Sequence, residues 1–512
     1  GCSNCMHDEI ELKLQAPPAA LRDILESEFV CKIRVGAVST RRLVSTYFDT
    51  PRHTLRKDGI ALRIRRLPDG YEQTLKSPVP GAAGLQTYRE WNSRVPDCVP
   101  VIAAVDDPEV RSILSLGNRH KRLVPLFTTD VERNTLPARF GGCDIELALD
   151  IGRIEAGNGN SESVSELELE LLDGDPSSVL ELALNLTELG DLSLGYLTKA
   201  ERGYALARPA LRQQAGKADK SGLAQGITVP GMFEAILNST LEHLRANEQP
   251  VAAGLPEGVH QARVAIRRLR AALWAFRGIL PVEERKAFNR ELRWFQRQLS
   301  PARDWHVFVK ETLPAVRSAY PGRRSTAARI GKTAREERAR VTGDIAGLFR
   351  DVRYTRLVLG FTQWVAKQSA SIDNSLSGQP VTEFAAGILD ESHRKFLSDT
   401  RPLSRMSAKK RHTLRKRGKK LRYACEFFSS LWPGQHTEKY LRSMKHLQEA
   451  LGVINDVSVA GQSIGSLDSA GAETRHDKLV GEWSDMRLAE CLRETQPKWR
   501  KFQKQEPFWR SG

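Results

Sequence analysis

The chain lacks long apolar runs and has few cysteines. No apolar stretch approaches the roughly 20 residues that a membrane-spanning helix needs, so the sequence predicts no membrane span. No basic segment followed by an apolar core opens the chain, and we expect no secretory signal peptide. The seven cysteines are an odd number and scattered, which favours reduced thiols in a cytoplasmic protein. Cys2 and Cys5 form a pair just before Met6, and we interpret them as a vector remnant rather than a zinc site.

The two parts of the 512-residue chain differ in net charge. Residues 1–210 contain 25 Lys and Arg against 31 Asp and Glu, a net charge of −6. Residues 211–512 contain 53 against 31, a net charge of +22. The length allows two or three domains. The charge difference predicts two domains with different electrostatic roles, of which the second faces a polyanion.

Charged and apolar side chains alternate along many segments of residues 7–205, which is typical of β-strands with one charged face. The strands predicted from this alternation lie at 9–13, 46–51, 61–65, 71–76, 87–91, 131–133, 144–150 and 165–171. Helices are predicted over 21–29, 108–116 and 177–189. This part of the chain is therefore predicted to be mainly a β-domain.

Two architectures can hold these strands. In a sandwich, the apolar faces meet in the core and the charged faces contact water. In a closed tunnel of about eight strands, the charged faces point inward and helices cover the outside. Acidic and basic strands occur together, which favours the tunnel, because a dry core with unpaired charges would cost several kcal/mol for each ion. The alternation alone leaves both architectures open.

Six short motifs, in this order along the chain, resemble the CYTH domain of triphosphate tunnel metalloenzymes. They are Glu9-x-Glu11-x-Lys13, YFDT at 47–50, LRIR at 62–65, ALD at 148–150, SELELE at 165–170 and KAERGY at 199–204. The resemblance covers residues 7–205. It implies an eight-stranded antiparallel β tunnel with flanking helices, which binds a triphosphate together with a divalent metal ion.

The resemblance also implies roles for individual side chains. The acidic positions that would hold Mg²⁺ or Mn²⁺ are Glu9, Glu11, Asp150, Glu166 and Glu168. The positions that would bind phosphate are Lys13, Arg63, Arg65, Arg133 and Lys199, with Arg89 as a further candidate. The expected catalytic residues are Lys76, Glu9 and Glu11, of which Lys76 would handle the attacking water or its proton. Glu170 shares the face of Glu168 and is interpreted as a wall residue.

Residues 206–228 are polar and predict a linker, and a helical period dominates residues 229–510. The segment from His260 to Arg270 aligns with the segment from His412 to Arg422, 152 positions later. Matches at the same offset continue to Asp304 and Asp456. The second part is therefore predicted to be a duplicated helical unit, namely two helical bundles related by a pseudo-twofold axis.

In each copy a histidine and basic residues at spacings of three and seven form one stripe on a helix. Nine of the fourteen positions 409–422 are Lys or Arg, and such density is favourable only if the helix is solvated or binds an anion. Gly418 is unfavourable within this helix, and the sequence offers no reason for it. The candidate anion-binding residues are His260, Arg263, Arg267, Arg268, Arg270, His412, Arg415, Lys419, Lys420 and Arg422.

This second part resembles a CHAD domain, the conserved-histidine α-helical module. The motifs that carry the resemblance are HQARVAIRRLR at 260–270, PARDWHVF at 301–308, HTLRKRGKKLRY at 412–423 and LQEALGVINDV at 447–457. The resemblance covers residues 229–510. It implies a pair of four-helix bundles that line a basic groove and bind inorganic polyphosphate. Asn455 departs from the pattern, since the first copy has Arg303 at the equivalent position.

The combined expectation is an inorganic triphosphatase with a polyphosphate-binding helical domain. Thiamine or nucleoside triphosphate hydrolysis, or adenylate cyclase activity, are alternatives for the tunnel. A non-catalytic scaffold that binds polyanions or nucleic acid is a further alternative, because DNA presents the same phosphate charge. Intact acidic and basic tunnel motifs argue against that scaffold.

Overall fold

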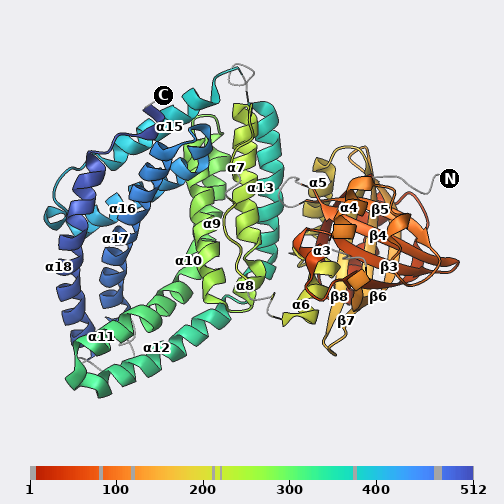
Figure 1. Cartoon of the computed structure of the whole chain (residues 1–512), viewed down its shortest axis with the longest axis horizontal. Helices are drawn as coiled ribbons and strands as arrows, with labels where there is room; N and C mark the ends of the chain where they lie inside the picture. The colour runs from red at the N-terminus through yellow and green to blue at the C-terminus, as the bar shows by residue number, and fades with distance from the viewer. Residues whose placement is uncertain are drawn as a thin grey trace. The chain divides into compact units, whose positions relative to one another are not determined.

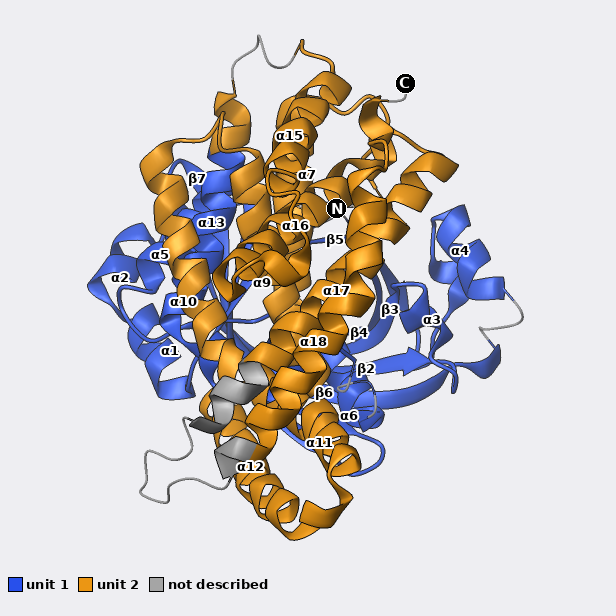
Figure 2. Ribbon diagram, turned by 90° about the vertical axis from the view of Figure 1, so that its left-hand side faces the viewer, with its two compact units in different colours: residues 1–215, 248–253, 347–367 blue, residues 216–247, 254–346, 368–512 orange. Residues whose placement is uncertain are grey.

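The computed structural model of the chain describes residues 7–79, 85–116, 121–209, 211, 214–219, 222–372, 378–465 and 476–510. Side chains are described from Glu9 onward, except for residues 459–465 and 476–478. Cys2 and Cys5 lie outside the described residues. The chain forms two compact units (Figure 2). The first contains residues 1–215, 248–253 and 347–367, and the second contains residues 216–247, 254–346 and 368–512.

The first unit is built on one antiparallel sheet (Figure 1). Its strands are β1 (His7–Gln15), β2 (Ser39–Asp49), β3 (Ala61–Leu67), β4 (Gly70–Pro78), β5 (Gln86–Val95), β6 (Val124–Phe140), β7 (Cys143–Ala156), β8 (Ser161–Asp173) and the two-residue β9 (Ser193–Leu194). The strand order is β5-β4-β3-β2-β6-β7-β8-β1, and β1 also pairs with β5. This last pairing closes the first eight strands into a barrel.

Closure decides between the two architectures that the alternation allowed. Along β1 the apolar Leu12 and Leu14 point to the outside, where α1 (Pro18–Leu25) and α5 (Ser177–Leu186) cover the barrel wall. Glu9, Glu11 and Lys13 point to the inside and line an interior cavity. The predicted tunnel with inward charges is therefore confirmed, and the sandwich is wrong.

Further helices of the first unit are α2 (Glu28–Ile33), α3 (Thr54–Lys57), α4 (Pro108–Ser115), α6 (Lys199–Ala207) and α8 (Glu248–Ala252). The single helix predicted over 21–29 is wrong, because α1 ends at Leu25 and α2 begins at Glu28. Ser27 caps the second helix, since its hydroxyl accepts a hydrogen bond from the Val30 amide at 3.3 Å.

The other described α-helices are α7 (Val229–Arg245), α9 (Pro256–Ala275), α10 (Val282–Val307), α11 (Leu313–Ala319), α12 (Arg324–Asp344), α13 (Val352–Ser371), α15 (Val381–Phe396), α16 (Ala408–Phe428), α17 (Gln435–Gly465) and α18 (His476–Gln503). Helices α7, α9, α10 and α12 begin 152 or 153 positions before α15, α16, α17 and α18, respectively. Within each set, consecutive helices pack together. The predicted duplication is thus a duplication of four-helix sets. Among the described helices, none is long and apolar enough to cross a membrane.

Gly418 of α16 has a structural reason that the sequence did not reveal. A Cβ at this position would lie 1.9 Å from Nε2 of Gln448 and 2.8 Å from the ring of Phe396. Gln448 belongs to α17 and Phe396 to α15, and both are buried. Glycine is therefore required because α16 packs against two neighbouring helices without room for a side chain.

We expect Gly418→Ala to destabilise the helical domain by about 1–2 kcal/mol, because overpacking costs about 1–3 kcal/mol and exceeds the gain of about 1 kcal/mol from better helix propensity. Gly387→Ala is the matched control, since a Cβ added to Gly387 of α15 would have nothing within 4 Å. The control should gain up to about 1 kcal/mol. Chemical denaturation measures both, and a stabilising Gly418→Ala would contradict this packing.

Candidate active site

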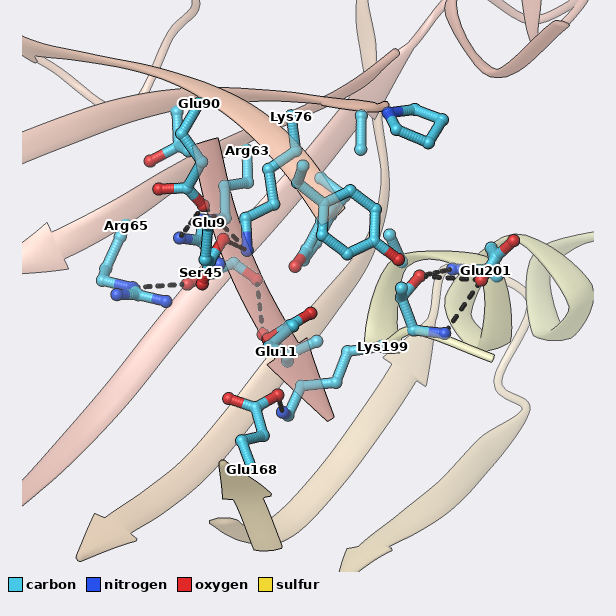
Figure 3. A pocket seen from close by; sticks show the side chains of 18 of the residues that line it. Glu9, Glu11, Ser45, Arg63, Arg65, Lys76, Glu90, Glu168, Lys199 and Glu201 are labelled. Atoms are coloured by element: carbon cyan, nitrogen blue, oxygen red, sulfur yellow. Dashed lines mark hydrogen bonds and ion pairs between the residues drawn. The ribbon is translucent and has the colours of Figure 1, made fainter. Parts of the chain in front are cut away.

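The barrel encloses a cavity of about 570 Å³. Most of the tunnel residues that the sequence predicted line this cavity, and Figure 3 shows several of them. They are Glu9, Glu11, Lys13, Arg63, Arg65, Lys76, Arg133, Asp150, Glu168 and Lys199. Strand alternation brings them together, because each lies at an inward position of its strand or at the start of α6.

Three carboxylates form the acidic part of the site. Asp150 of β7 and Glu166 and Glu168 of β8 each offer an oxygen atom within 4.8 Å of the others, and all three are buried. Nζ of Lys199 lies 2.6 Å from Asp150, 2.5 Å from Glu166 and 2.9 Å from Glu168. An ammonium group thus occupies the place that favours a cation. Carboxylate oxygens are the ligands that hard divalent cations prefer, so this triad could hold a metal ion.

Cations compensate these buried carboxylates. Arg133 donates two hydrogen bonds of 2.7 Å to Asp150 and also contacts Glu168. Burial alone would raise the pKa of Glu168, but Lys13, Lys199 and Arg133 outweigh burial and hold this pKa well below its usual value. Burial would likewise lower the pKa of Lys13, but Glu11 and Glu168 hold it well above its usual value. Glu168 and Lys13 are therefore both charged at neutral pH.

Glu9 and Glu11 lie outside this triad. The Glu11 carboxylate accepts a hydrogen bond from Lys13. The Glu9 carboxylate forms an ion pair with Lys76, which also pairs with Glu90 at 2.8 Å. The structure therefore divides the five predicted metal ligands into a buried triad and two carboxylates that are each paired with a lysine.

The opposite wall carries excess positive charge. Arg63 and Arg65 lie two residues apart on β3, and both point into the cavity. The Arg63 guanidinium, followed by burial and Arg133, lowers the pKa of Arg65 to about 9, although Glu72 acts in the opposite direction. Nε of Arg65 donates to the Ser45 hydroxyl at 3.1 Å, which orients the guanidinium (Figure 3). Repulsion between these cations favours an anion in the cavity.

Arg89, which was predicted to bind phosphate, does not line the cavity. It follows Tyr88 and precedes Glu90 on β5, and those two residues line the cavity while Arg89 does not. Alternation turns Arg89 to the outer face of the sheet. There the pKa of Asp107 is lowered mainly by a hydrogen bond from the Val110 amide, against the effect of burial, and the charge of Arg89 lowers it further. Its inward neighbour Glu90, which was not predicted, contacts Lys76 instead. The sequence alone does not determine the strand register that decides which of the two residues faces inward.

Two further residues position the site, although their roles were not predicted from their motifs. Arg202 of KAERGY donates from Nη1 to Glu166 at 3.1 Å and from Nη2 to the Ser163 carbonyl at 2.6 Å, which fixes one member of the triad. Asp49 of YFDT is fully buried and accepts hydrogen bonds from the Leu55 amide at 2.9 Å and the Tyr204 hydroxyl at 3.0 Å. It ties β2 to α3 and α6.

In the helical unit, basic residues from both copies converge. Arg263 and Arg267 of α9 act electrostatically on Lys419 of α16, whose pKa is lowered to about 6 by burial first and then by Arg267 and Arg415. We call these four residues (Arg263, Arg267, Arg415 and Lys419) the central cation set. Arg263 pairs with Asp304 at 3.4 Å, and the equivalent Arg415 pairs with Asp456 at 3.8 Å, as the repeat predicts.

The two histidines of the repeat border this set but are not charged at neutral pH. Burial, followed by Arg303, lowers the pKa of His260 to about 4. Burial also lowers the pKa of His412, whose Nδ1 lies 3.2 Å from Asn455. Of the other predicted anion-binding residues, Arg268 and Arg422 both pair with Glu426, so they are not part of the central cation set. Further along the helices, Lys420 lies near the Trp274 ring, and Arg270, which donates to Gln296, acts electrostatically on Lys420.

A closed eight-stranded barrel with an acidic triad and a cationic wall, joined to a duplicated helical domain, defines a two-domain architecture. Residues 7–204 match the family model of the CYTH domain, and residues 235–464 match that of the CHAD domain. The chain therefore carries a CYTH domain followed by a CHAD domain.

The chain is also similar to several known proteins. It is 30% identical over 206 residues to an inorganic triphosphatase of Haemophilus influenzae, covering 40% of this chain and 56% of that protein. It is 26% identical over 317 residues to an uncharacterized protein of Mycobacterium tuberculosis, covering 59% and 58%. The chain thus spans somewhat more than half the length of these curated relatives. A crystal structure of the CHAD domain from the plant Ricinus communis is 28% identical, covers 56% of this chain and 96% of that chain, and has a TM-score of 0.46.

The depressed pKa of Glu168 predicts how the stability of the barrel depends on pH. A carboxylate whose pKa is lowered on folding contributes stability above its ordinary value of 4.5, and this stability is lost as the pH falls toward the folded pKa. Glu168→Gln removes a partner of three cations, so we expect it to cost about 3–5 kcal/mol at pH 7. The difference from the wild type should shrink below pH 4.5.

Denaturation followed by circular dichroism between pH 7 and pH 3 tests this. Glu155→Gln is the control, because Glu155 is half exposed and pairs with Arg153 on the outside of the barrel. A gap between Glu168→Gln and the wild type that stays constant across this pH range would contradict the depressed pKa.

Proposed function

We propose that the tunnel hydrolyses inorganic triphosphate to pyrophosphate and phosphate with Mg²⁺ or Mn²⁺, and that the helical domain binds inorganic polyphosphate. One observation carries the first part, namely that a single cavity is lined both by Asp150 and Glu168 of the carboxylate triad and by a wall of guanidinium groups, with Glu166 buried directly behind them. A triphosphate carries several negative charges along a short chain, so it needs cations along its length. The likeness to an inorganic triphosphatase supports the same activity.

The triad fits the proposed metal. Asp150, Glu166 and Glu168 would hold the ion, since all three offer oxygen and already surround the Lys199 ammonium. When bound, a divalent ion supplies charge neutralisation at the phosphoryl oxygens. Arg202 keeps Glu166 in place, and Arg133 does the same for Asp150. The ligands are thus oriented before any ion arrives.

The guanidinium wall binds and orients the phosphates. Arg63 and Arg65 offer planar donor groups that match phosphate oxygens, and an anion relieves the repulsion that lowers the pKa of Arg65. Lys13, Arg133 and Lys199 extend the cationic lining toward the triad. Phosphates held between the wall and the triad would have their terminal group beside the metal ligands.

Lys76 is placed to handle the attacking water. Its ammonium lies between Glu9 and Glu90, so two carboxylates hold it at a fixed position in the cavity. A water molecule there could donate to Glu9 while Lys76 donates to it, which aligns the nucleophile and gives its proton an acceptor. In this proposal Glu9 acts in catalysis rather than as a triad ligand, and Glu11 fixes Lys13.

The cavity favours an inorganic substrate over one with a base or thiazole ring. Among its described lining residues the aromatic ones are Tyr47, Tyr88 and Tyr204. Tyr47 stacks on Phe127 at 4.6 Å, and the Tyr204 hydroxyl is bonded to Asp49. Lys76 lies 5.2 Å from the centre of the Tyr88 ring. These rings are engaged within the protein, which supports inorganic triphosphate.

We expect Lys76→Ala and Glu9→Ala to lower phosphate release from tripolyphosphate at least about 100-fold, because each removes a group that orients the water. Arg89→Ala is the matched control on β5 and should stay within about twofold of the wild type, since Arg89 faces away from the cavity. Full activity of both tunnel variants would overturn the proposed roles.

A substrate panel separates the candidate activities. Tripolyphosphate, ATP, thiamine triphosphate and long-chain polyphosphate are each assayed with Mg²⁺ and Mn²⁺ and after removal of metal with a chelator. We expect the highest kcat/KM for tripolyphosphate and no activity without metal. Formation of cyclic AMP from ATP, or faster hydrolysis of thiamine triphosphate, would identify one of the alternatives instead.

The central cation set supports polyphosphate binding by the helical domain. Its three arginines are balanced by only two carboxylates, Asp304 and Asp456. A bound anion would in addition favour the protonated form of Lys419, whose pKa burial and neighbouring arginines lower to about 6. Arg267→Gln combined with Lys419→Gln should weaken binding of long-chain polyphosphate about tenfold or more, measured by isothermal titration of the full chain. Tighter binding of duplex DNA than of polyphosphate at equal salt would contradict this partner.

A further inference from the structure

The two copies of the helical repeat differ in charge where α9 and α16 pack against each other. Positions 152 apart are equivalent, so Arg268 corresponds to Lys420 and Trp274 corresponds to Glu426. In each case the basic residue of one helix contacts the Trp274 or Glu426 position of the other helix. Arg268 of α9 donates to Glu426 of α16 at 2.7 Å, and Lys420 of α16 lies 5.2 Å from the ring of Trp274 of α9.

At the end of the crossing that contains Glu426, the carboxylate neutralises its basic neighbours. It pairs with Arg268 at 2.7 Å and with Arg422 at 3.0 Å. The Arg268 guanidinium also lies 5.1 Å from the centre of the Phe427 ring, and little of its side chain is exposed. These cations are therefore satisfied within the protein.

At the equivalent end an indole takes the place of the carboxylate. The Trp274 ring has Arg277 at 4.3 Å, Lys420 at 5.2 Å and Lys395 at 5.8 Å from its centre. Cation–π contact attracts these groups to the ring, but the neutral ring does not cancel their charge as a carboxylate would. Glu391 is a carboxylate here, and it pairs with Arg277 and Lys395.

Charges at equivalent positions show how unequal the two ends are. Lys420 and the four basic residues that act electrostatically on it form what we call the Trp274 cluster, namely Arg270, Arg277, Lys395, Arg417 and Lys420. Their equivalents in the other copy are Arg422, Ser429, His243, Ala265 and Arg268, respectively. Burial lowers the pKa of His243, so it is neutral. Five cations with one carboxylate give +4 in the Trp274 cluster, whereas two cations with one carboxylate give +1 at the Glu426 end.

The Trp274 cluster is accessible and electrostatically strained. The side chain of Lys395 is 51% exposed, and Lys420 is also exposed. Burial, followed by the charges of Lys395 and Arg270, lowers the pKa of Lys420. Like charges held this close together repel one another, and an anion from solvent would relieve that repulsion.

We propose that the Trp274 cluster is a second anion subsite, which extends polyphosphate binding beyond the central cation set at one end of the α9–α16 crossing only. The inference rests on the proposed binding of polyphosphate by this domain. Arg270 of the cluster is three residues from Arg267 of the central set, so the two groups are neighbours along one face of α9. A chain of phosphates is therefore bound toward Trp274 and not toward Glu426.

The ligand is inorganic polyphosphate rather than nucleic acid. Nucleic acid binding commonly uses aromatic rings as stacking platforms for bases. The Trp274 ring is already contacted by Arg277 and has two lysine ammonium groups near it. It serves to gather cations, which suits a ligand that offers charge alone.

The test compares single charge removals at the two ends in the full-length protein. Lys420→Gln and Lys395→Gln remove charge from the Trp274 cluster, and Arg422→Gln removes one charge two residues further along α16, at the Glu426 end. Binding of long-chain polyphosphate is measured by isothermal titration at several salt concentrations. Lys420→Arg keeps the charge and should keep the affinity, which separates charge from folding.

We expect Lys420→Gln to weaken binding roughly fivefold to tenfold, and to reduce the slope of log Kd against log salt by about 0.7. Lys395→Gln should weaken binding less, because Lys395 also pairs with Glu391. Arg422→Gln should change Kd by less than about twofold, because Arg422 is paired with Glu426.

The possible failures are distinguishable. If the wild type binds polyphosphate but Arg422→Gln weakens binding as much as Lys420→Gln, or neither lysine variant has an effect, the second subsite is overturned and the proposed function stands. If single-stranded DNA binds more tightly than polyphosphate and loses affinity in Lys420→Gln, the ligand assignment is overturned. If the wild type binds no polyphosphate, the proposed function of the domain fails and the subsite with it.

Discussion

A closed sheet that points its charges inward must compensate them inside, and this constraint shapes the first domain. Buried ions cost several kcal/mol each unless partners and hydrogen bonds offset the loss of water. Asp150, Glu166 and Glu168 are compensated by Lys199, Arg133 and Lys13. Arg63 and Arg65 are compensated less completely, as the low pKa of Arg65 shows. The imbalance leaves room for an anion on one wall, while the triad on the other can exchange an ammonium group for a metal ion.

Strand alternation predicted much of this site, because it determines which residues share a face. It did not determine whether that face points inward, which depends on the pairing of β1 with β5, two strands separated by about 70 residues. The register of β5 could not be predicted from the sequence either. Arg89 and Glu90 are adjacent, and only the structure shows that Glu90 meets Lys76 while Arg89 faces outward. Glu9 and Glu11 resemble metal ligands in sequence, but their lysine partners separate them from the triad.

The helical domain shows a different limit. An offset of 152 positions was visible in the sequence, and the equivalent pairs Arg263–Asp304 and Arg415–Asp456 follow from it. The difference between the copies was not visible, because it depends on which residue of α16 meets which residue of α9. The need for glycine at position 418 was not visible in the sequence either, because it depends on the positions of Gln448 and Phe396 on neighbouring helices. Periodicity thus predicts the repeated framework, whereas contacts between helices determine where its charge is left uncompensated.

One cavity is proposed to join a metal-binding triad to a phosphate-binding wall, and the rest of the proposed chemistry depends on this. The most direct measurement is a crystal structure with Mn²⁺ and a non-hydrolysable imido analogue of triphosphate, with data collected at the manganese absorption edge. We predict an anomalous peak at oxygen-ligand distance from Asp150 and Glu168 and phosphate groups bonded to Arg63 and Arg65. An anomalous peak away from the triad, or phosphates bound outside the barrel, would contradict it.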